Sequence, residues 1–422
     1  MLAADPSRHR LSAIVWVCLA LLLGLAACGD RDTNSAQSVN TVGVTETLPT
    51  ATVSPSPVRD ASPTTVPTST LAADASPTPP PSKATIPPPL PGRPDQPVIT
   101  ALDAATGTAR WQHNLVTLSD LLVGGDALYF IDETQSLVAL DLITGTERWR
   151  VPVPNSSALN VADETTVYLD VNGAVHAINA AAGQERWVAT GFVALAAGDG
   201  IVVGWSSPDT GLRVLDAETG QDRWAVPVGN TGLTGLPIIA GDTVYVGLPA
   251  SERGGEGVYA LDVLDGTIRW TVEIPSGQAI DVEAGNVVIF SFVSTREVFA
   301  VDQASGQERW RHTIRDESSG IEQVVSSDDS VYIIAPGWDI GSPVVALELQ
   351  TGAVRWEAVS YRPPIGATTR LIVVMADHPS PEDASQVEGL DELTGTPTWS
   401  YASGDLRELV VSETTVVVST WE

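Results

Sequence analysis

The chain is short of cysteine and lysine, and both shortages limit the chemistry that it can carry. Its only two cysteines, Cys18 and Cys28, lie near the N-terminus of the 422 residues. The body of the chain therefore has no disulfide and no metal site with cysteine ligands, so its stability must come from packing. Lys83 is the only lysine, which leaves no later lysine to form a Schiff base or to grip a phosphate.

Positive charge is also scarce. Arginine and lysine total 22 against 52 aspartates and glutamates, for a formal net charge of −30. A surface this acidic repels phosphate backbones, so we expect no nucleic-acid partner. It suits cationic partners, and a solvated acidic exterior without any specific partner would give the same composition.

Recognisable catalytic and metal-binding motifs are missing as well. There is no HExxH, G-x-S-x-G, phosphate loop or complete calcium loop, and the histidines show no metal-ligand spacing. The five histidines are His9, His113, His176, His312 and His378. We therefore expect no catalytic residue, no metal and no cofactor.

The N-terminus reads as an export signal. Arg8 and Arg10 precede an apolar run of 17 residues, Leu11 to Ala27, which is marginal for spanning a bilayer. The sequence LAAC that ends at Cys28 resembles the lipobox of bacterial lipoproteins. That resemblance implies cleavage before Cys28, lipidation of Cys28 and an extracytoplasmic location on a bacterial cell membrane. An uncleaved membrane anchor is the alternative.

A stalk is predicted between the lipid and the folded body. Half of the chain's 30 prolines lie in the Thr-, Ser- and Ala-rich segment 29–97, and no aromatic residue occurs between Trp16 and Trp111. Without large apolar groups such a segment is expected to be disordered. The predicted division is a signal peptide at 1–27, a lipidated cysteine and stalk at 28–97, and a folded domain at 98–422.

The folded part repeats one pattern eight times, as in ALDAATGTARW and ALDLITGTERW. A glycine and a tryptophan recur four residues apart in every copy, and neighbouring copies lie 37 to 46 residues apart. The glycines are Gly107, Gly145, Gly183, Gly220, Gly266, Gly306, Gly352 and Gly395, and the tryptophans are Trp111, Trp149, Trp187, Trp224, Trp270, Trp310, Trp356 and Trp399. This period is typical of a four-stranded propeller blade.

Each part of the repeat has a physical reason. The aspartate caps a turn, the glycine supplies a backbone angle that other residues resist, and the tryptophan is predicted to wedge between neighbouring blades. A second hairpin signal, such as GGDALYFI, lies between copies. The fold class is therefore an all-β, eight-bladed propeller of four-stranded antiparallel blades. The hairpins 98–112 and 406–420 are expected to pair and close the ring.

The pattern A-L-D-x-x-T-G-x-x-R-W resembles the docking repeat of quinoprotein (PQQ)-like β-propellers over residues 98–422. One branch of that family holds quinone-dependent dehydrogenases, which carry an adjacent cysteine pair that is missing here. The other is the non-catalytic, BamB-like lipoprotein branch, which implies a protein-binding scaffold. We expect the scaffold role, with an unidentified extracytoplasmic protein or cell-wall component as partner. A PQQ-dependent dehydrogenase and a carbohydrate or cell-wall binding module are the alternatives.

Candidate partner-binding residues lie in three loops that are longer than the others. The loops are 248–257, 335–342 and 376–386, all in the second half of the repeat array. Loops on rigid scaffolds are frequent binding sites, which favours an aromatic anchor with polar companions. The nominated residues are Trp338, Arg253, Asp339, His378 and Asp383. Tolerated insertions, with Trp338 folded back onto its blade, would produce the same sequence.

Overall fold

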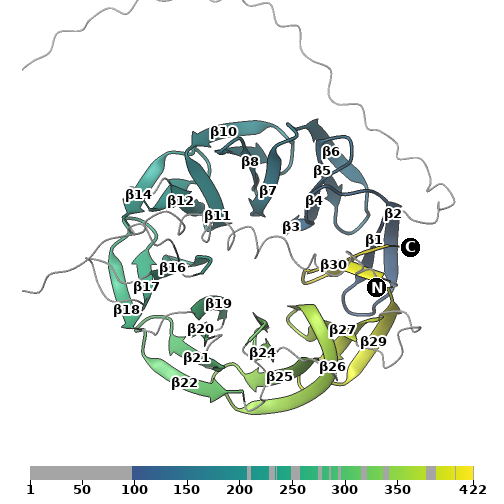
Figure 1. Ribbon diagram of the computed structural model, residues 1–422, viewed down its shortest axis with the longest axis vertical. Coiled ribbons are helices and arrows are strands. Elements are labelled where there is room, and N and C mark those ends of the chain that lie inside the picture. Colours follow the sequence, from purple (N-terminus) through teal and green to yellow (C-terminus); the bar gives the residue numbers. More distant parts are fainter. Residues whose placement is uncertain are drawn as a thin grey trace, which may run out of the picture. The chain divides into compact units, whose positions relative to one another are not determined.

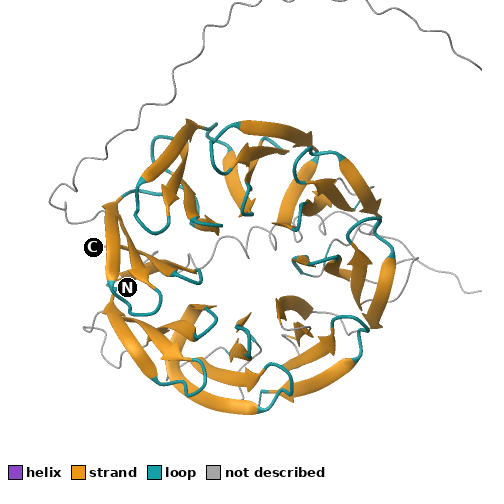
Figure 2. Cartoon of the chain, turned by 180° about the vertical axis from the view of Figure 1, so that it is seen from behind, coloured by secondary structure: helices purple, strands orange, loops and turns teal. Residues whose placement is uncertain are grey.

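A computed structural model describes residues 97–206, 211–227, 233, 235–248, 257–273, 278–284, 287–292, 296–314, 321–335, 342–403 and 405–421. These residues form 31 β-strands, arranged as eight blades around a central opening (Figure 1). Every regular element among them is a strand, as the second view also shows (Figure 2). The predicted all-β, eight-bladed propeller is confirmed.

The first four blades follow one another along the chain, each running from its inner to its outer strand. Blade 1 contains β3 (Leu122–Gly124), β4 (Ala127–Ile131), β5 (Ser136–Asp141) and β6 (Glu147–Pro152). Blade 2 contains β7 (Ser157–Ala162), β8 (Thr166–Val171), β9 (Ala174–Asn179) and β10 (Glu185–Thr190). Blade 3 contains β11 (Phe192–Gly198), β12 (Ile201–Ser206), β13 (Leu212–Asp216) and β14 (Asp222–Val226). Blade 4 contains β15 (Ile238–Ala240), β16 (Thr243–Leu248), β17 (Gly257–Asp262) and β18 (Ile268–Glu273).

The next three blades repeat this order with one departure. Blade 5 contains β19 (Gln278–Ala284), β20 (Val287–Phe292), β21 (Glu297–Asp302) and β22 (Glu308–Thr313). Blade 6 contains β23 (Gln323–Ser326), β24 (Ser330–Ile334), β25 (Ser342–Glu348) and the first half of β26 (Val354–Ala367). Blade 7 contains the second half of β26, then β27 (Leu371–Ala376), β28 (Gln386–Asp391) and β29 (Pro397–Ala402). Because β26 serves both blades, they form one continuous seven-stranded sheet.

Blade 8 closes the ring with strands from both ends of the described chain. Its order is β2 (Ala109–Asn114), β1 (Pro97–Asp103), β31 (Thr415–Trp421) and β30 (Asp405–Val411). β1 pairs with β31 in an unbroken antiparallel register from Pro97–Trp421 to Asp103–Thr415. In Figure 1 the yellow β30 therefore shares a sheet with the dark blue β1 and β2. The pairing of terminal hairpins that the sequence predicts is confirmed.

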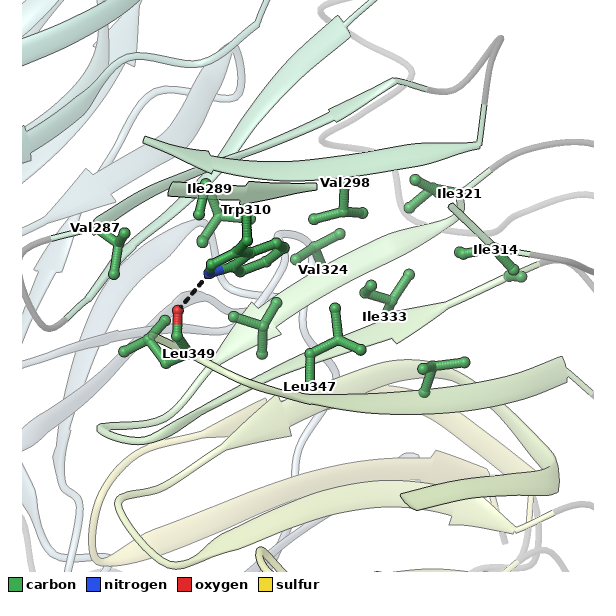
Figure 3. Close-up of a cluster of buried hydrophobic side chains, with 14 residues drawn as sticks. Val287, Ile289, Val298, Trp310, Ile314, Ile321, Val324, Ile333, Leu347 and Leu349 are labelled. Atoms are coloured by element: carbon green, nitrogen blue, oxygen red, sulfur yellow. Dashed lines mark hydrogen bonds between the residues drawn. The ribbon is translucent and has the colours of Figure 1, made fainter. Parts of the chain in front are cut away.

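The core is divided among the seams between blades. The second strand of a blade is buried along its length, as in β4 and β24, because neighbouring blades cover both faces of the sheet. At the seam of blades 5 and 6, Trp310 belongs to a cluster of 14 buried side chains (Figure 3). It joins Val287 and Ile289 of blade 5 to Ile333 and Leu347 of blade 6. Neighbouring blades are therefore held together by packing across every such seam.

The antiparallel order gives the ring two different faces. The turns that carry the repeated glycines join the third strand of a blade to the fourth, and we call the side on which they lie the repeat-turn face. Turns from the first to the second strand lie on the same side. Connections from the second to the third strand, such as Asn172–Gly173 in blade 2, lie on the opposite face. β1 begins at Pro97 on this opposite face, because Pro97 pairs with Trp421 at the end of β31.

Candidate functional site

Seven of the eight repeat turns begin with an aspartate or glutamate, and Asn179 takes that place in blade 2. In blade 5, Oδ1 of Asp302 accepts hydrogen bonds from the backbone N–H groups of Ala304 and Ser305 and from the Ser305 hydroxyl. The N–H of Gly306 donates to the carbonyl oxygen of Asp302 at 2.8 Å. These bonds close the turn between β21 and β22 and fix the direction in which the next strand leaves.

In five repeats the arginine next to the repeat tryptophan pairs with this carboxylate. Arg309 donates to Oδ2 of Asp302 and, with the Ser305 hydroxyl, holds the pKa of Asp302 at about 2. The equivalent ion pairs, at 2.6 to 2.9 Å, are Asp103–Arg110, Asp141–Arg148, Asp216–Arg223 and Asp262–Arg269. No role was predicted for this arginine, although the seven-residue spacing is visible in the sequence. The guanidinium charge is therefore paired within the same repeat.

The repeat tryptophans join each blade to the next. The indole Nε1–H of Trp310 in blade 5 donates to the carbonyl oxygen of Leu349 in blade 6, at 2.8 Å (Figure 3). The same bond, at 2.7 to 3.0 Å, recurs around the ring in Trp111–Leu142, Trp149–Ala180, Trp187–Ala217, Trp224–Val263, Trp270–Gln303, Trp356–Glu392 and Trp399–Ala104. The last pair crosses from blade 7 to blade 8, so the cycle of eight indole bonds is closed.

Each repeat glycine lies beneath the indole of the preceding blade. The eight glycines have φ between +67° and +70°, and a Cβ atom on any of them would lie 2.5 to 2.7 Å from a ring atom of that indole. In blade 5 the nearest atom is Cδ2 of Trp270. Glycine is therefore required twice over, for the left-handed backbone angle and for the close approach of the ring.

Gly306→Ala is expected to lower the free energy of unfolding by about 2–3 kcal/mol, because it combines left-handed strain with overpacking against Trp270. Gly241→Ala is a matched control, since Gly241 has φ of +57° but a Cβ methyl group on it would have no neighbouring atom within 4 Å. The free energy of unfolding of that control should fall by only about 1–2 kcal/mol, because only the backbone angle is unfavourable. Chemical denaturation of both variants measures the difference, and equal losses would show that the contact with Trp270 costs nothing.

Four buried tyrosines support the indoles from inside their own blades. Their ring centroids lie 5.7 to 5.9 Å from those of the tryptophans in the pairs Tyr129–Trp149, Tyr168–Trp187, Tyr245–Trp270 and Tyr332–Trp356. Burial raises the pKa of Tyr129 to about 12. These tyrosines were not predicted as partners of the tryptophans. The signal for them is their fixed place in the second strand, as in ALYFI and SVYII.

The seam between blades 6 and 7 departs from the repeat. The residue that offers its carbonyl to the indole is apolar in six copies, but here it is Glu392, whose buried carboxylate accepts a bond of 2.6 Å from the Ser327 hydroxyl. The amide of Gln323 on β23 donates to the carbonyl of Ile365 on β26 and accepts from its N–H, at 2.9 and 3.0 Å. Polar side chains thus reinforce the one seam that a continuous strand already spans.

A second polar cluster lies where blade 8 meets blade 1. Oε1 of Glu408, on the inner strand β30, accepts a hydrogen bond of 2.8 Å from the N–H of Leu121. Burial raises the pKa of Glu408 to about 7, and the Asp120 carboxylate acts in the same direction. The Leu121 N–H and the Arg407 guanidinium oppose the shift. Burial also raises the pKa of Asp120.

The raised pKa of Glu408 predicts a pH dependence of stability. Folding favours its protonated form, so the stabilisation is fully present below the ordinary value of 4.5 and is lost as the pH rises through about 7. Glu408→Gln removes this titration. As the pH rises from about 5 to about 8, the free energy of unfolding of the variant should increase relative to that of the wild type by on the order of 1–2 kcal/mol. Urea denaturation across this range tests the expectation, and parallel pH profiles for the two proteins would contradict it.

The histidines that the structure describes lie in strands. Nε2 of His113 is 2.8 Å from the carbonyl oxygen of Gly145, and Nδ1 of His176 is 2.6 Å from a carboxylate oxygen of Glu185. Within the described ranges, no three His, Cys, Asp or Glu side chains are grouped so that they could hold a metal ion. In the same part of the chain, no helix is long and apolar enough to cross a membrane.

The predicted partner-binding and lipidation residues are not among those that the structure describes. Trp338, Arg253, Asp339, His378 and Asp383 fall in the gaps between described ranges, and Cys28 precedes residue 97. The three long loops join β16 to β17, β24 to β25 and β27 to β28. The structure therefore places each of the eight repeat glycines against one of the eight repeat tryptophans. The other nominated residues stay predictions.

Comparison with known proteins identifies the repeats. The family model described as "Outer membrane protein assembly factor BamB" matches residues 95–193, 156–301, 208–368 and 294–420. The outer membrane protein assembly factor BamB of Burkholderia pseudomallei is 25% identical over 214 residues, which cover 49% of this chain and 47% of that protein. The serine/threonine-protein kinase AfsK of Streptomyces griseus is 32% identical over 148 residues, which cover 32% of this chain and 17% of the kinase.

Solved structures support the fold. The crystal structure of the computationally designed protein Ika8 superimposes with a TM-score of 0.53 at 16% identity, covering 74% of this chain and 97% of the designed one. At this identity the likeness concerns the fold alone. The matched regions span less than half the length of either curated relative.

Proposed function

Because the chain belongs to the family of PQQ-type repeats described as outer membrane protein assembly factor BamB, we propose that it is a non-enzymatic protein-interaction scaffold. In this proposal a lipid on Cys28 holds it at the extracytoplasmic side of a bacterial cell membrane. The name of the Burkholderia relative, an outer membrane protein assembly factor, supports a membrane location and a role in binding other proteins. The lipobox-like LAAC sequence supports the anchor.

The observation that carries the proposal is the closed cycle of indole bonds. The residues that define the repeat have structural roles. The tryptophans and glycines join neighbouring blades, and the arginines pair with turn carboxylates within their own blade. A ring built in this way is rigid and offers a large surface whose exposed positions are free to vary. Rigid scaffolds with variable surface positions are suited to recognising other proteins.

The anchor is tested by Cys28→Ala in the full chain. Wild-type protein should fractionate with membranes and carry acyl chains on an N-terminal cysteine, as measured by mass spectrometry of the N-terminal peptide. The variant should lose the lipid and leave the membrane fraction after washing. An unmodified Cys28 in membrane-bound wild-type protein would refute lipidation and favour an uncleaved anchor.

The scaffold role is tested by crosslinking intact cells that produce the full chain and identifying the captured proteins by mass spectrometry. A defined extracytoplasmic protein, captured from wild-type cells and not from cells that produce an unrelated lipoprotein, is the expected result. Recovery of cell-wall glycan without protein would instead favour a carbohydrate-binding module. Quinone-dependent turnover of an alcohol by the purified protein would refute the non-enzymatic role.

A further inference from the structure

Two positions in each repeat turn vary freely in chemistry, and the residues there are exposed except Glu147, which is half-buried. The first follows the Asp, Glu or Asn that begins the turn by two residues, and the second precedes the tryptophan by two. The first position is occupied by Ala105, Ile143, Ala181, Glu218, Leu264, Ala304, Gln350 and Leu393. The second is occupied by Ala109, Glu147, Glu185, Asp222, Ile268, Glu308, Val354 and Pro397. Since alanine, glutamate and glutamine all serve, the turn itself requires no large apolar side chain at either position.

Blade 4 is the one copy with a large aliphatic side chain at both positions. Leu264 is 75% exposed and Ile268 is 50% exposed. Beside Ile268 lies a small recess between blades 3 and 4, which is also lined by Val226 and Pro227 of blade 3 and by Tyr259 of blade 4. We call Leu264 and Ile268 the blade-4 patch. Exposed apolar groups gathered in this way are typical of a surface that meets another molecule.

The patch is held on a rigid turn. The N–H of Leu264 donates to Oδ1 of Asp262 at 2.8 Å, and the N–H of Gly266 donates to the carbonyl oxygen of Asp262 at 2.9 Å. The indole of Trp224 donates to the carbonyl of Val263, directly before Leu264, at 2.8 Å. A leucine that is already fixed in place loses little conformational freedom when a partner covers it, which favours binding.

The charges around the patch select the chemistry of its partner. The turns of blades 3 and 4 on this face carry seven carboxylates, and the adjoining strands carry three guanidinium groups. The carboxylates belong to Asp199, Asp216, Glu218, Asp222, Asp242, Asp262 and Asp265, and the guanidinium groups to Arg213, Arg223 and Arg269. Each arginine is already paired, in Arg213–Asp222, Arg223–Asp216, Arg269–Asp242 and Arg269–Asp262. The surplus is negative, which favours a cationic partner.

The same charges disfavour two other occupants. Anionic lipid surfaces repel carboxylates, so a membrane is a poor match for an apolar patch in an acidic surround. A second copy of this chain carries the same net charge of −30 and is repelled in the same way. A polypeptide that presents an apolar side chain between basic residues satisfies both the patch and its surround.

We propose that the blade-4 patch docks a segment of the partner protein in which a large apolar side chain is flanked by lysine or arginine. This rests on the proposed scaffold function and gives it a location on the repeat-turn face. The apolar side chain covers Leu264 and Ile268, while the basic residues meet the carboxylates of Glu218 and Asp265. These contacts explain why blade 4 alone departs from the repeat at both exposed positions.

The test is selection of peptides from a random displayed library on the full chain. The expected peptides contain a large apolar residue with lysine or arginine within a few positions, and their affinity falls as salt is added. The variant Leu264→Ser/Ile268→Ser should weaken them at least about tenfold. Leu393→Ser is the matched control, because Leu393 occupies the same turn position on blade 7 and is 62% exposed. It should leave their affinity unchanged.

Three results would overturn the proposal. They are selection that yields no basic–apolar peptides, selected peptides that bind the double variant as well as the wild type, and phosphatidylglycerol vesicles that bind through Leu264. The side chains are exposed, so the melting temperatures of wild type and variants should agree; if the double variant unfolds early, Leu264→Ser alone is used. Crosslinking in cells separates the two proposals: a partner captured equally by the double variant keeps the scaffold function and refutes this surface.

Discussion

Replacing Trp310 by alanine is expected to lower the free energy of unfolding by about 3–5 kcal/mol. The indole is buried in the seam between blades 5 and 6, among Ile289, Val324 and Leu347, and its N–H bond to Leu349 is also lost. The seam cannot collapse to fill the space, because its two walls belong to sheets that other blades hold in place. Equilibrium denaturation in urea measures the loss.

Trp310→Phe separates the ring from its hydrogen bond. Phenylalanine keeps most of the apolar contact but cannot donate to the Leu349 carbonyl, so the expected loss is about 1–2 kcal/mol. An exposed substitution, Ile143→Ala, should leave stability within about 0.5 kcal/mol of the wild type. A loss below about 1 kcal/mol for Trp310→Ala would mean that the indoles do not hold the ring together.

Ile99→Asp is expected to prevent closure of the ring. Ile99 lies in the middle of β1, is fully buried, and packs with Leu128, Phe130 and Val417 at the seam of blades 8 and 1. An unpaired carboxylate there costs about 3–5 kcal/mol or more, because the described side chains that pack in this cluster are apolar. Loss of the β1–β31 pairing would expose the edges of β1 and β31, which invites association between chains.

The expected signature of Ile99→Asp is a loss of cooperative unfolding together with oligomers in size-exclusion chromatography. Ile99→Val is the control, with an expected loss of about 0.5–1.5 kcal/mol and a monomeric elution volume unchanged from the wild type. A monomeric, cooperatively unfolding Ile99→Asp protein would show that the terminal hairpins are dispensable for the fold.

The fold could be predicted from the sequence because its signal is repeated and local. Asp, Gly and Trp stand at fixed intervals in a short turn, and the physical demands of that turn recur in each blade, as the Asp302 turn and Gly306 illustrate. Closure of the ring could be predicted by counting strands, because the described chain starts on the third strand of a blade and ends on the second strand of the same blade. The spacing of copies does not reveal that β26 would run through from blade 6 to blade 7.

Features that depend on contacts between distant residues could not be predicted in this way. The partner of the Trp399 indole, Ala104, is nearly 300 positions away, and the bond between Ser327 and Glu392 joins turns of two blades. The pKa of Glu408 is raised by burial beside Leu121 and Asp120, and no local sequence pattern encodes this environment. The loop nominees Trp338 and Arg253 depend on loop conformation rather than on the repeat, so they stay predictions.

The position of β1 has a mechanical consequence. The segment that precedes Pro97 enters a strand that is paired on both sides, with β2 and with β31. Inter-strand bonds of antiparallel strands run perpendicular to the strand axis. Tension applied through that segment along β1 would thus load two ladders in shear, with many bonds sharing the force at once. A chain tethered at this end would resist extraction by flow or by a moving partner better than one tethered at an edge strand, where the bonds would peel apart one by one.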